Sequence, residues 1–410
     1  MRRAGAVLAV LLLFASSLEG ATISADGELR YELFGYPDAG RRGDAVENFI
    51  EGRLRVRGAL GASLGYRAEG RVVADDAEFT AGMVDPRMTE RRRPYLTIPE
   101  AVIDWRPTET LRLSLGRQIV NWSGVDEFQP ANLMAPLDES DIFRRVTMGA
   151  FGVAGHWDGP VTVDLMVVPA AFQGNRLPQG RWRFVPDGIP LDSRAAPVRM
   201  EETQVGVRVG GQLGALDAAL IGYLGRDMFP LFTLAPGAVC PLQGVVARNP
   251  RTRAAGATAS YPLGESILLR SEVVYHASPD AERDDFFQYV PLGIEYTRDD
   301  WRIVLNYLRY DRTHRAAGAV SQGERRFYPS FLFGEASWDA GGRLRARLRA
   351  GYDFQDAFVL VEPELSYRVW RELRVGLVAH LIHDHAARGF DYFDLIRNED
   401  RIGMRMQYFF

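Results

Sequence analysis

The chain of 410 residues contains no lysine, a single cysteine and, after its first residues, no long apolar run. All 49 basic residues are therefore arginines, which stay charged at any working pH. One cysteine, Cys240, excludes an internal disulfide framework. A formal net charge of −4 argues against nucleic acid as a partner, because proteins that bind nucleic acids carry an excess of positive charge on the binding surface. Beyond Ala15 no stretch reaches the roughly 18 apolar residues of a membrane helix.

The N-terminus has the pattern of a secretory signal peptide. Arg2 and Arg3 precede an apolar stretch from Ala4 to Ala15, and small and polar residues follow. We assign residues 1–21 to this signal, with cleavage between Ser17 and Ala21. Cys240 lies far from the cleavage site, which excludes a lipoprotein anchor. An exported chain without a membrane helix is either a soluble secreted protein or a β-barrel, and a mean hydropathy of −0.15 allows both.

Period-two alternation of apolar and polar residues predicts that the mature chain is all-β. Leu111, Leu113 and Leu115, for example, alternate with polar or small residues. Eighteen segments read as strands, near 28–36, 45–57, 60–74, 97–106, 109–119, 145–157, 160–170, 202–213, 215–226, 251–262, 265–277, 286–298, 301–311, 327–338, 342–353, 357–369, 371–382 and 400–410.

The connections between these segments alternate between tight turns and long loops. Tight turns stand at 157–160, 213–215, 262–265, 299–300 and 339–342, and long loops at 75–96, 120–144, 171–201, 227–250, 312–326 and 383–399. Short periplasmic turns and long outer loops are typical of outer-membrane barrels. This phase places both termini in the periplasm and requires an even number of strands, about 18, with 16 as the alternative. A soluble β-sandwich also has alternation and turns, but it leaves the signal peptide unexplained.

The last nine residues resemble the C-terminal insertion signal of bacterial outer-membrane β-barrels. Ile402, Met404, Met406 and Tyr408 alternate with polar or small residues, and the chain ends on Phe410. The resemblance implies that residues 22–410 form a membrane-spanning, antiparallel up-and-down β-barrel in the bacterial outer membrane. It also implies outer-membrane lipid and lipopolysaccharide as surroundings, the barrel-assembly machinery as a partner that reads Phe410, and a homotrimer as one assembly of such barrels.

A second resemblance lies in the segment from Leu115 to Asp138. A strand ending in Gly-Arg-Gln, then Asn121-Trp122 and a proline-punctuated loop, is similar to a block in porin-like proteobacterial outer-membrane barrels, several of unknown function. The resemblance covers about thirty residues and implies a channel or transporter. The glycine usual after the tryptophan is replaced here by Ser123-Gly124, so the resemblance does not give the exact shape of this turn.

Arginines dominate the polar faces of several predicted strands. In a closed barrel one face meets lipid, where each arginine would cost a few kcal/mol near the midplane, so we expect these arginines to face the lumen. The pore-lining candidates are Arg343, Arg345, Arg347, Arg349, Arg53, Arg55, Arg57, Arg112 and Arg302. Glu362 and Glu364 should lie within cross-strand reach of Arg345 and Arg347. The arginines either form structural ion pairs or make a positive lumen that favours anions.

The loop at 120–144 is acidic, and it supplies the other constriction candidates, Asp126, Glu127 and Asp138. Folded into the barrel opposite the arginines, it would create a transverse field. On the outer surface its carboxylates would only be solvated or bind divalent cations. Composition leaves both placements open.

An outer-membrane hydrolase that modifies lipid and a transporter of hydrophobic substrates are the alternatives to a channel. His276 and Ser278 resemble the base and nucleophile of lipid A deacylases, but a three-residue match is weak without an orienting third group. Only a few residues precede the first predicted strand, so an N-terminal plug, as in energy-coupled receptors, is not expected. A barrel plugged by its own loops, transporting hydrophobic substrates, stays open as an alternative.

His380, His383 and His385 could suggest a metal site, but His380 points to the opposite face of its strand from the other two. The sequence thus predicts a non-enzymatic channel for passive diffusion of small hydrophilic solutes, biased toward anions. It predicts no catalytic residue, metal or cofactor.

Overall fold

The computed structural model describes part of the chain in detail. These residues are 21–37, 45–76, 80, 82–84, 93–169, 174–178, 182, 189–194, 199–235, 243–280, 283–314, 329–355, 357–384, 396 and 399–410. The predicted signal peptide, apart from Ala21, lies outside them, as do Cys240 and His385.

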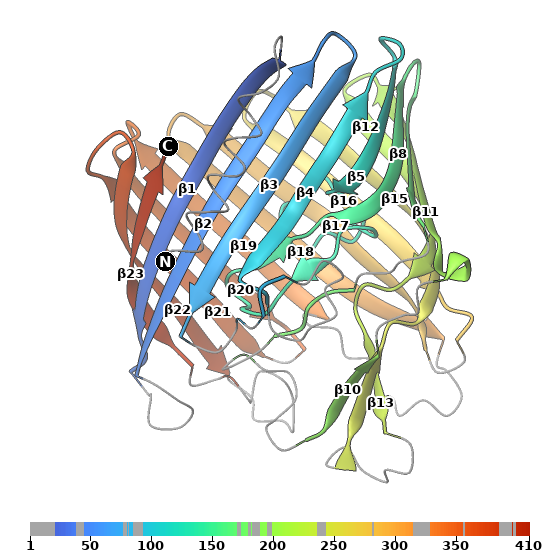
Figure 1. The fold of residues 1–410 in the computed structure, drawn as a ribbon. Coiled ribbons are helices and arrows are strands. Elements are labelled where there is room, and N and C mark those ends of the chain that lie inside the picture. Colours follow the sequence, from blue (N-terminus) through green and yellow to red (C-terminus); the bar gives the residue numbers. More distant parts are fainter. Residues whose placement is uncertain are drawn as a thin grey trace.

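Eighteen antiparallel strands form one closed barrel (Figure 1). They are β1 (Ala21–Gly35), β2 (Val46–Leu60), β3 (Leu64–Asp75), β4 (Leu96–Trp105), β5 (Leu111–Gln118), β8 (Ala150–Asp158), β9 (Thr162–Val168), β11 (Gln204–Leu213), β12 (Leu216–Arg226), β15 (Arg251–Leu263), β16 (Ile267–Ala277), β17 (Asp285–Arg298), β18 (Trp301–His314), β19 (Ser330–Ala340), β20 (Leu344–Asp353), β21 (Phe358–Arg368), β22 (Leu373–Asp384) and β23 (Arg401–Phe409). Each pairs with its neighbours along this series, and β1 pairs with β23, which leaves no open edge.

All eighteen predicted strands are present, so the all-β barrel is confirmed and the alternative of sixteen strands is wrong. The main difference in extent is at the first strand, which begins at Ala21 instead of near residue 28. Its first residues pair with the end of β2, where alternation in the sequence is weak.

Alternation sets the two faces of the wall. On β20–β23 the outward side chains include Leu348, Leu365, Leu377 and Met404, which are 48%, 50%, 59% and 49% exposed. Most of the intervening positions are polar or small and point inward, and Phe358, Val378 and Ile382 are buried apolar side chains on the same inner face. The barrel therefore has an apolar outer surface and a charged interior, as expected for a wall with lipid on one side and water on the other.

The two rims of the barrel differ. Tight turns close one rim, at the top of Figure 1, and long connections leave the other. Gly214 and Gly264 adopt positive φ values of 65° and 70° in two of the tight turns, a conformation that glycine accepts without strain. The connection after β20, between Asp353 and Phe358, is short although it lies on the rim of the long connections.

The chain end is built into the tight-turn rim. Phe410 exchanges two backbone hydrogen bonds with Gly27, at 2.8 and 3.0 Å, and its ring covers that glycine. A Cβ at position 27 would clash with the ring in this position, so a larger residue there would require Phe410 to move.

The other described elements are short and lie outside the barrel wall. β10 (Leu191–Arg194), β13 (Leu231–Leu234) and β14 (Val245–Arg248) form a three-stranded sheet that projects beyond the loop rim (Figure 1). β6 (Leu137–Asp138) and β7 (Val146–Thr147) pair within the connection from β5 to β8, and η2 (Met200–Glu202) is a short 3-10 helix before β11. Among the described residues, no helix has the length and apolar character to cross a bilayer.

Candidate functional site: the barrel interior and its inner loop

The connection from β5 to β8, residues 119–149 (the inner loop), is held against the inner wall by one carboxylate. Glu272 of β16 accepts hydrogen bonds from Ser123 Oγ at 2.7 Å and from the backbone N–H groups of Gly124, Val125 and Ala131 at 2.5, 3.2 and 3.3 Å. A carboxylate that accepts several N–H bonds substitutes for the missing backbone partners of a buried loop.

The far end of the inner loop is fixed to the opposite wall. Arg144 pairs with Glu32 of β1 and Glu47 of β2, each at 2.7 Å, and Arg401 of β23 pairs with Asp141 at 2.9 Å. β2 and β16 stand nine strands apart around the ring of eighteen. The inner loop therefore crosses the full width of the barrel, and it lies inside instead of on the outer surface.

Apolar contacts pack the inner loop against the barrel wall on two sides. One cluster packs Val125 and Ile142 against Phe331 and Phe358 of β19 and β21. The other packs Trp122 and other loop residues against β8, β9, β12, β15 and β16. Two-sided packing and buried ion pairs together hold the inner loop as a fixed cross-brace.

The predicted loop carboxylates are in ion pairs with the wall. Asp126 lies 2.5 Å from the Arg302 guanidinium and 3.4 Å from that of Arg270. Glu127 pairs with Arg349 and, at 2.8 Å, with Arg145 of the same loop. These contacts neutralise charge locally, so the broad transverse field expected from the sequence is reduced to closely paired charges.

Asp138 does not join the other two carboxylates. It is buried in β6, where it pairs with Arg176 at 2.8 Å and accepts a hydrogen bond from Ser140 Oγ at 2.6 Å. Burial alone would raise the pKa of this carboxyl, but the positive charges of Arg176 and Arg93 outweigh this effect and lower the pKa to about 2. Asp138 thus ties the β6 part of the inner loop to Arg176.

The predicted arginines on the inner face fall into two groups. Ion pairs hold Arg53 with Glu51 and Glu69, Arg55 with Glu69 and Asp26, Arg302 with Glu295 and Asp126, Arg347 with Glu364, and Arg349 with Glu362, Glu335 and Glu127. Within the described residues, Arg57, Arg112, Arg343 and Arg345 make no ion pair. All four lie toward the tight-turn rim of their strands.

The expected cross-strand contact of Arg347 is confirmed, because Arg347 faces Glu364 and pairs with it at 2.6 Å. Glu362 faces Arg349 instead of Arg345, which faces Ser366. The register follows from the length of the 354–357 turn, and a shift of two residues keeps the inward face unchanged, so alternation alone does not determine it.

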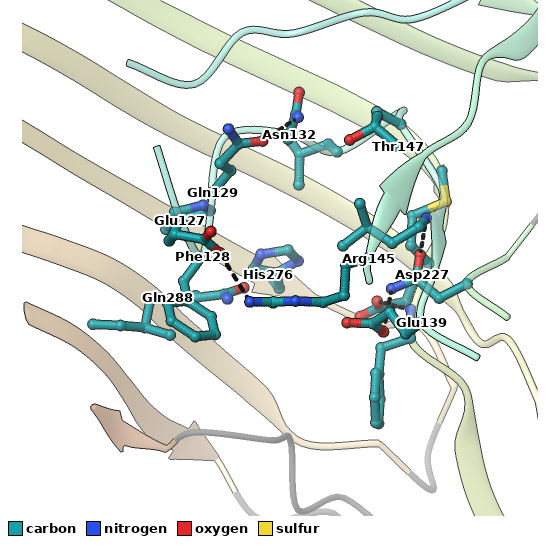
Figure 2. Close-up of a pocket in the computed structure, with 18 of the residues that line it drawn as sticks. Glu127, Phe128, Gln129, Asn132, Glu139, Arg145, Thr147, Asp227, His276 and Gln288 are labelled. Carbon is teal, nitrogen blue, oxygen red and sulfur yellow. Dashed lines mark hydrogen bonds and ion pairs between the residues drawn. The ribbon is translucent and has the colours of Figure 1, made fainter. Parts of the chain in front are cut away.

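A cavity of about 330 Å³ lies beside the inner loop (Figure 2). Figure 2 shows Arg145 extending across it to Glu127, with His276 and Gln288 on one side and Glu139 and Asp227 on the other. Burial raises the pKa of Glu139 even though Arg145 opposes the shift. The lining is thus mixed, with ionisable groups beside phenylalanine rings.

The structure does not assemble the lipid A deacylase pair suggested by the sequence. The Ser278 hydroxyl donates to the Arg251 carbonyl at 2.6 Å, and His276 stacks on Phe286. His380 accepts a hydrogen bond from Arg401 at 2.7 Å and stacks on Phe143. No group of three or more metal-ligating side chains occurs in the part of the chain that the structure describes.

Sequence reasoning missed the buried anchors Arg144, Glu32 and Glu47. Arg144 is about 100 residues away from both glutamates along the chain, so no local pattern connects them. The available signal was the pair Arg144-Arg145 in a loop otherwise rich in carboxylates, since two cations there need acidic partners elsewhere.

Comparison with known proteins yields structural matches only. No family model and no curated sequence matches the chain. Among solved structures, two engineered variants of Rhodopseudomonas blastica porin each match 95% of this chain and 100% of their own, with 14% identity and a TM-score of 0.45. The barrel assignment here rests on the strand pairing within this chain.

Proposed function

We propose that the protein is an outer-membrane channel for passive diffusion of small hydrophilic solutes. The observation that supports this most directly is the closed eighteen-strand barrel with an apolar outer surface and a charged interior. A barrel of this size encloses more space than its own wall side chains fill. On this proposal the inner loop narrows the passage.

We further propose that the passage favours anions. Asp126 and Glu127 of the inner loop form ion pairs with Arg302 and Arg349. The other candidate arginines, Arg57, Arg112, Arg343 and Arg345, have no acidic partner among the described residues. Guanidinium groups facing water in a narrow, low-dielectric passage raise the local concentration of anions.

The orientation follows from the same reasoning. Outer-membrane barrels have short turns in the periplasm, so we place both termini there, with residues 1–21 removed as a signal peptide. The exposed rings of Tyr408 and Phe410, which stack on each other, are available to the barrel-assembly machinery. Outer-membrane lipid and lipopolysaccharide then surround the wall, and a homotrimer is the assembly to test first.

A liposome-swelling assay tests the proposal. Purified, refolded mature protein in vesicles should admit a pentose, and should admit a monocarboxylate faster than an amine of similar size. A barrel that admits none of these solutes contradicts passive diffusion. Such a result would favour a barrel closed by its inner loop, whose cavity beside Phe128 and Phe143 has partly apolar walls.

A further inference from the structure

Four arginines converge at the tight-turn rim of β20, β21 and β22. Arg343 lies in the turn directly before β20, Arg345 is the second residue of β20, Arg368 ends β21, and Arg374 is the second residue of β22. The Arg368 amide donates to the Arg343 carbonyl at 2.8 Å, and Arg368 directly faces Arg374 across the next strand pair. Directly paired residues project from the same face of a sheet.

This face is the inner one. The intervening residues Leu348, Tyr367 and Leu377 are 48%, 49% and 59% exposed and form the outer surface. The four arginines alternate with them, so they face the mouth of the passage.

Two of the guanidinium groups are positioned at one point of the rim. Arg374 donates to the Ser366 hydroxyl at 3.2 Å and to the Gly342 carbonyl at 3.4 Å. Arg368 Nη1 lies 3.6 Å from the position that a Cβ of Gly342 would occupy. Both cations therefore approach the same glycine, which has φ of 72° and no side chain to separate them.

The cluster lacks the acidic partners found elsewhere on the inner wall. None of the four arginines makes an ion pair within the described residues, although Arg347, one step farther along β20, does so with Glu364 at 2.6 Å. Asp339 faces Arg345 across the strand pair and is its nearest carboxylate by register. Ser366 faces Arg345 on its other side, and Arg374 faces Arg368 and Gln407, so the four arginines outnumber the carboxylates directly opposite them. Like charges on one face repel unless an anion lies between them.

We propose that Arg343, Arg345, Arg368 and Arg374 form a binding site for a small oxyanion with two or more negative charges. Planar guanidinium groups match such an anion through paired N–H donors, which a monovalent spherical ion does not satisfy. The inference deepens the proposed channel function, on which its role in solute passage rests. The site would concentrate the oxyanion at the periplasmic mouth.

Calorimetric titration of the refolded mature protein in detergent with inorganic phosphate at low ionic strength tests the site. Wild type should bind phosphate, and the double variant Arg368→Gln/Arg374→Gln should bind at least tenfold more weakly. The control Arg106→Gln/Arg298→Gln removes two cations from other tight turns and should stay within twofold of wild type. Arg368→Lys/Arg374→Lys keeps the charge and loses the paired donors, so it should show an intermediate affinity.

Heat-modifiable gel mobility identifies any variant that fails to fold, and Arg343→Gln/Arg345→Gln then serves in place of the first pair. Equal phosphate affinity in wild type and a folded double variant, or no phosphate binding by wild type, would overturn the site. A barrel that binds phosphate without conducting would contradict the channel and retain the site. A conducting barrel without phosphate binding would do the reverse.

Discussion

At the scale of single residues, Glu272 is the side chain on which the position of the inner loop depends most. It accepts four hydrogen bonds from three backbone amides and one hydroxyl of that loop. Glu272→Ala leaves these donors without their acceptor, and each buried unsatisfied donor costs about 1–3 kcal/mol. We expect a lower denaturant midpoint in detergent together with a larger and noisier channel conductance. Glu265→Ala, an exposed glutamate at the turn of the same hairpin, should change neither.

Arg144 tests the opposite anchor. Arg144→Met leaves Glu32, Glu47 and Asp141 buried without one of their cations, and breaking a buried ion pair in this way costs about 3–5 kcal/mol. The free energy of unfolding should fall by an amount of that order. A loss below about 1 kcal/mol would show that apolar packing alone holds the inner loop.

Asp138 gives the inner loop a dependence on pH. Its folded pKa of about 2 lies below the unfolded value, so its stabilising contribution is present near neutral pH and is lost as pH falls toward 2. Wild type should exceed Asp138→Asn in denaturant midpoint at pH 6, and the gap should shrink steadily as the pH is lowered through about 4. A gap that does not change with pH would contradict an ionised Asp138.

At the scale of elements, the strands could be read from the sequence and their contacts could not. Period-two alternation locates each strand and its inward face, because both depend on neighbouring residues. The register of β20 against β21 depends on the turn that joins them, and a shift of two residues preserves the alternation. Alternation therefore does not predict that Arg345 faces Ser366.

The inner loop illustrates the same limit over a longer range. Its acidic composition is local, but its place inside the barrel depends on Glu272, Glu32 and Glu47, which lie about 100 residues or more away along the chain. Only the closed barrel brings those side chains around it. The distinction between paired and unpaired arginines on the wall likewise appears only once the cross-strand neighbours are known.

At the scale of the whole molecule, charge is distributed unevenly along the passage. Arg302 and Arg349 are neutralised by carboxylates of the inner loop, whereas Arg57, Arg112, Arg343 and Arg345 make no ion pair within the described residues. Exchanging Arg345 and Arg347 for glutamate should therefore invert the selectivity of the channel, with Arg345→Glu alone contributing most of the change. Reversal potentials under a salt gradient measure this. Unchanged selectivity in the double variant would place the filter elsewhere on the wall.

The most direct test of an anion-favouring channel is the reversal potential of the wild-type protein. Refolded mature protein in a planar bilayer, under a tenfold gradient of potassium chloride, should give steady channels whose reversal potential has the sign of chloride permeation. A reversal potential near zero, or one with the sign of potassium permeation, would contradict the account.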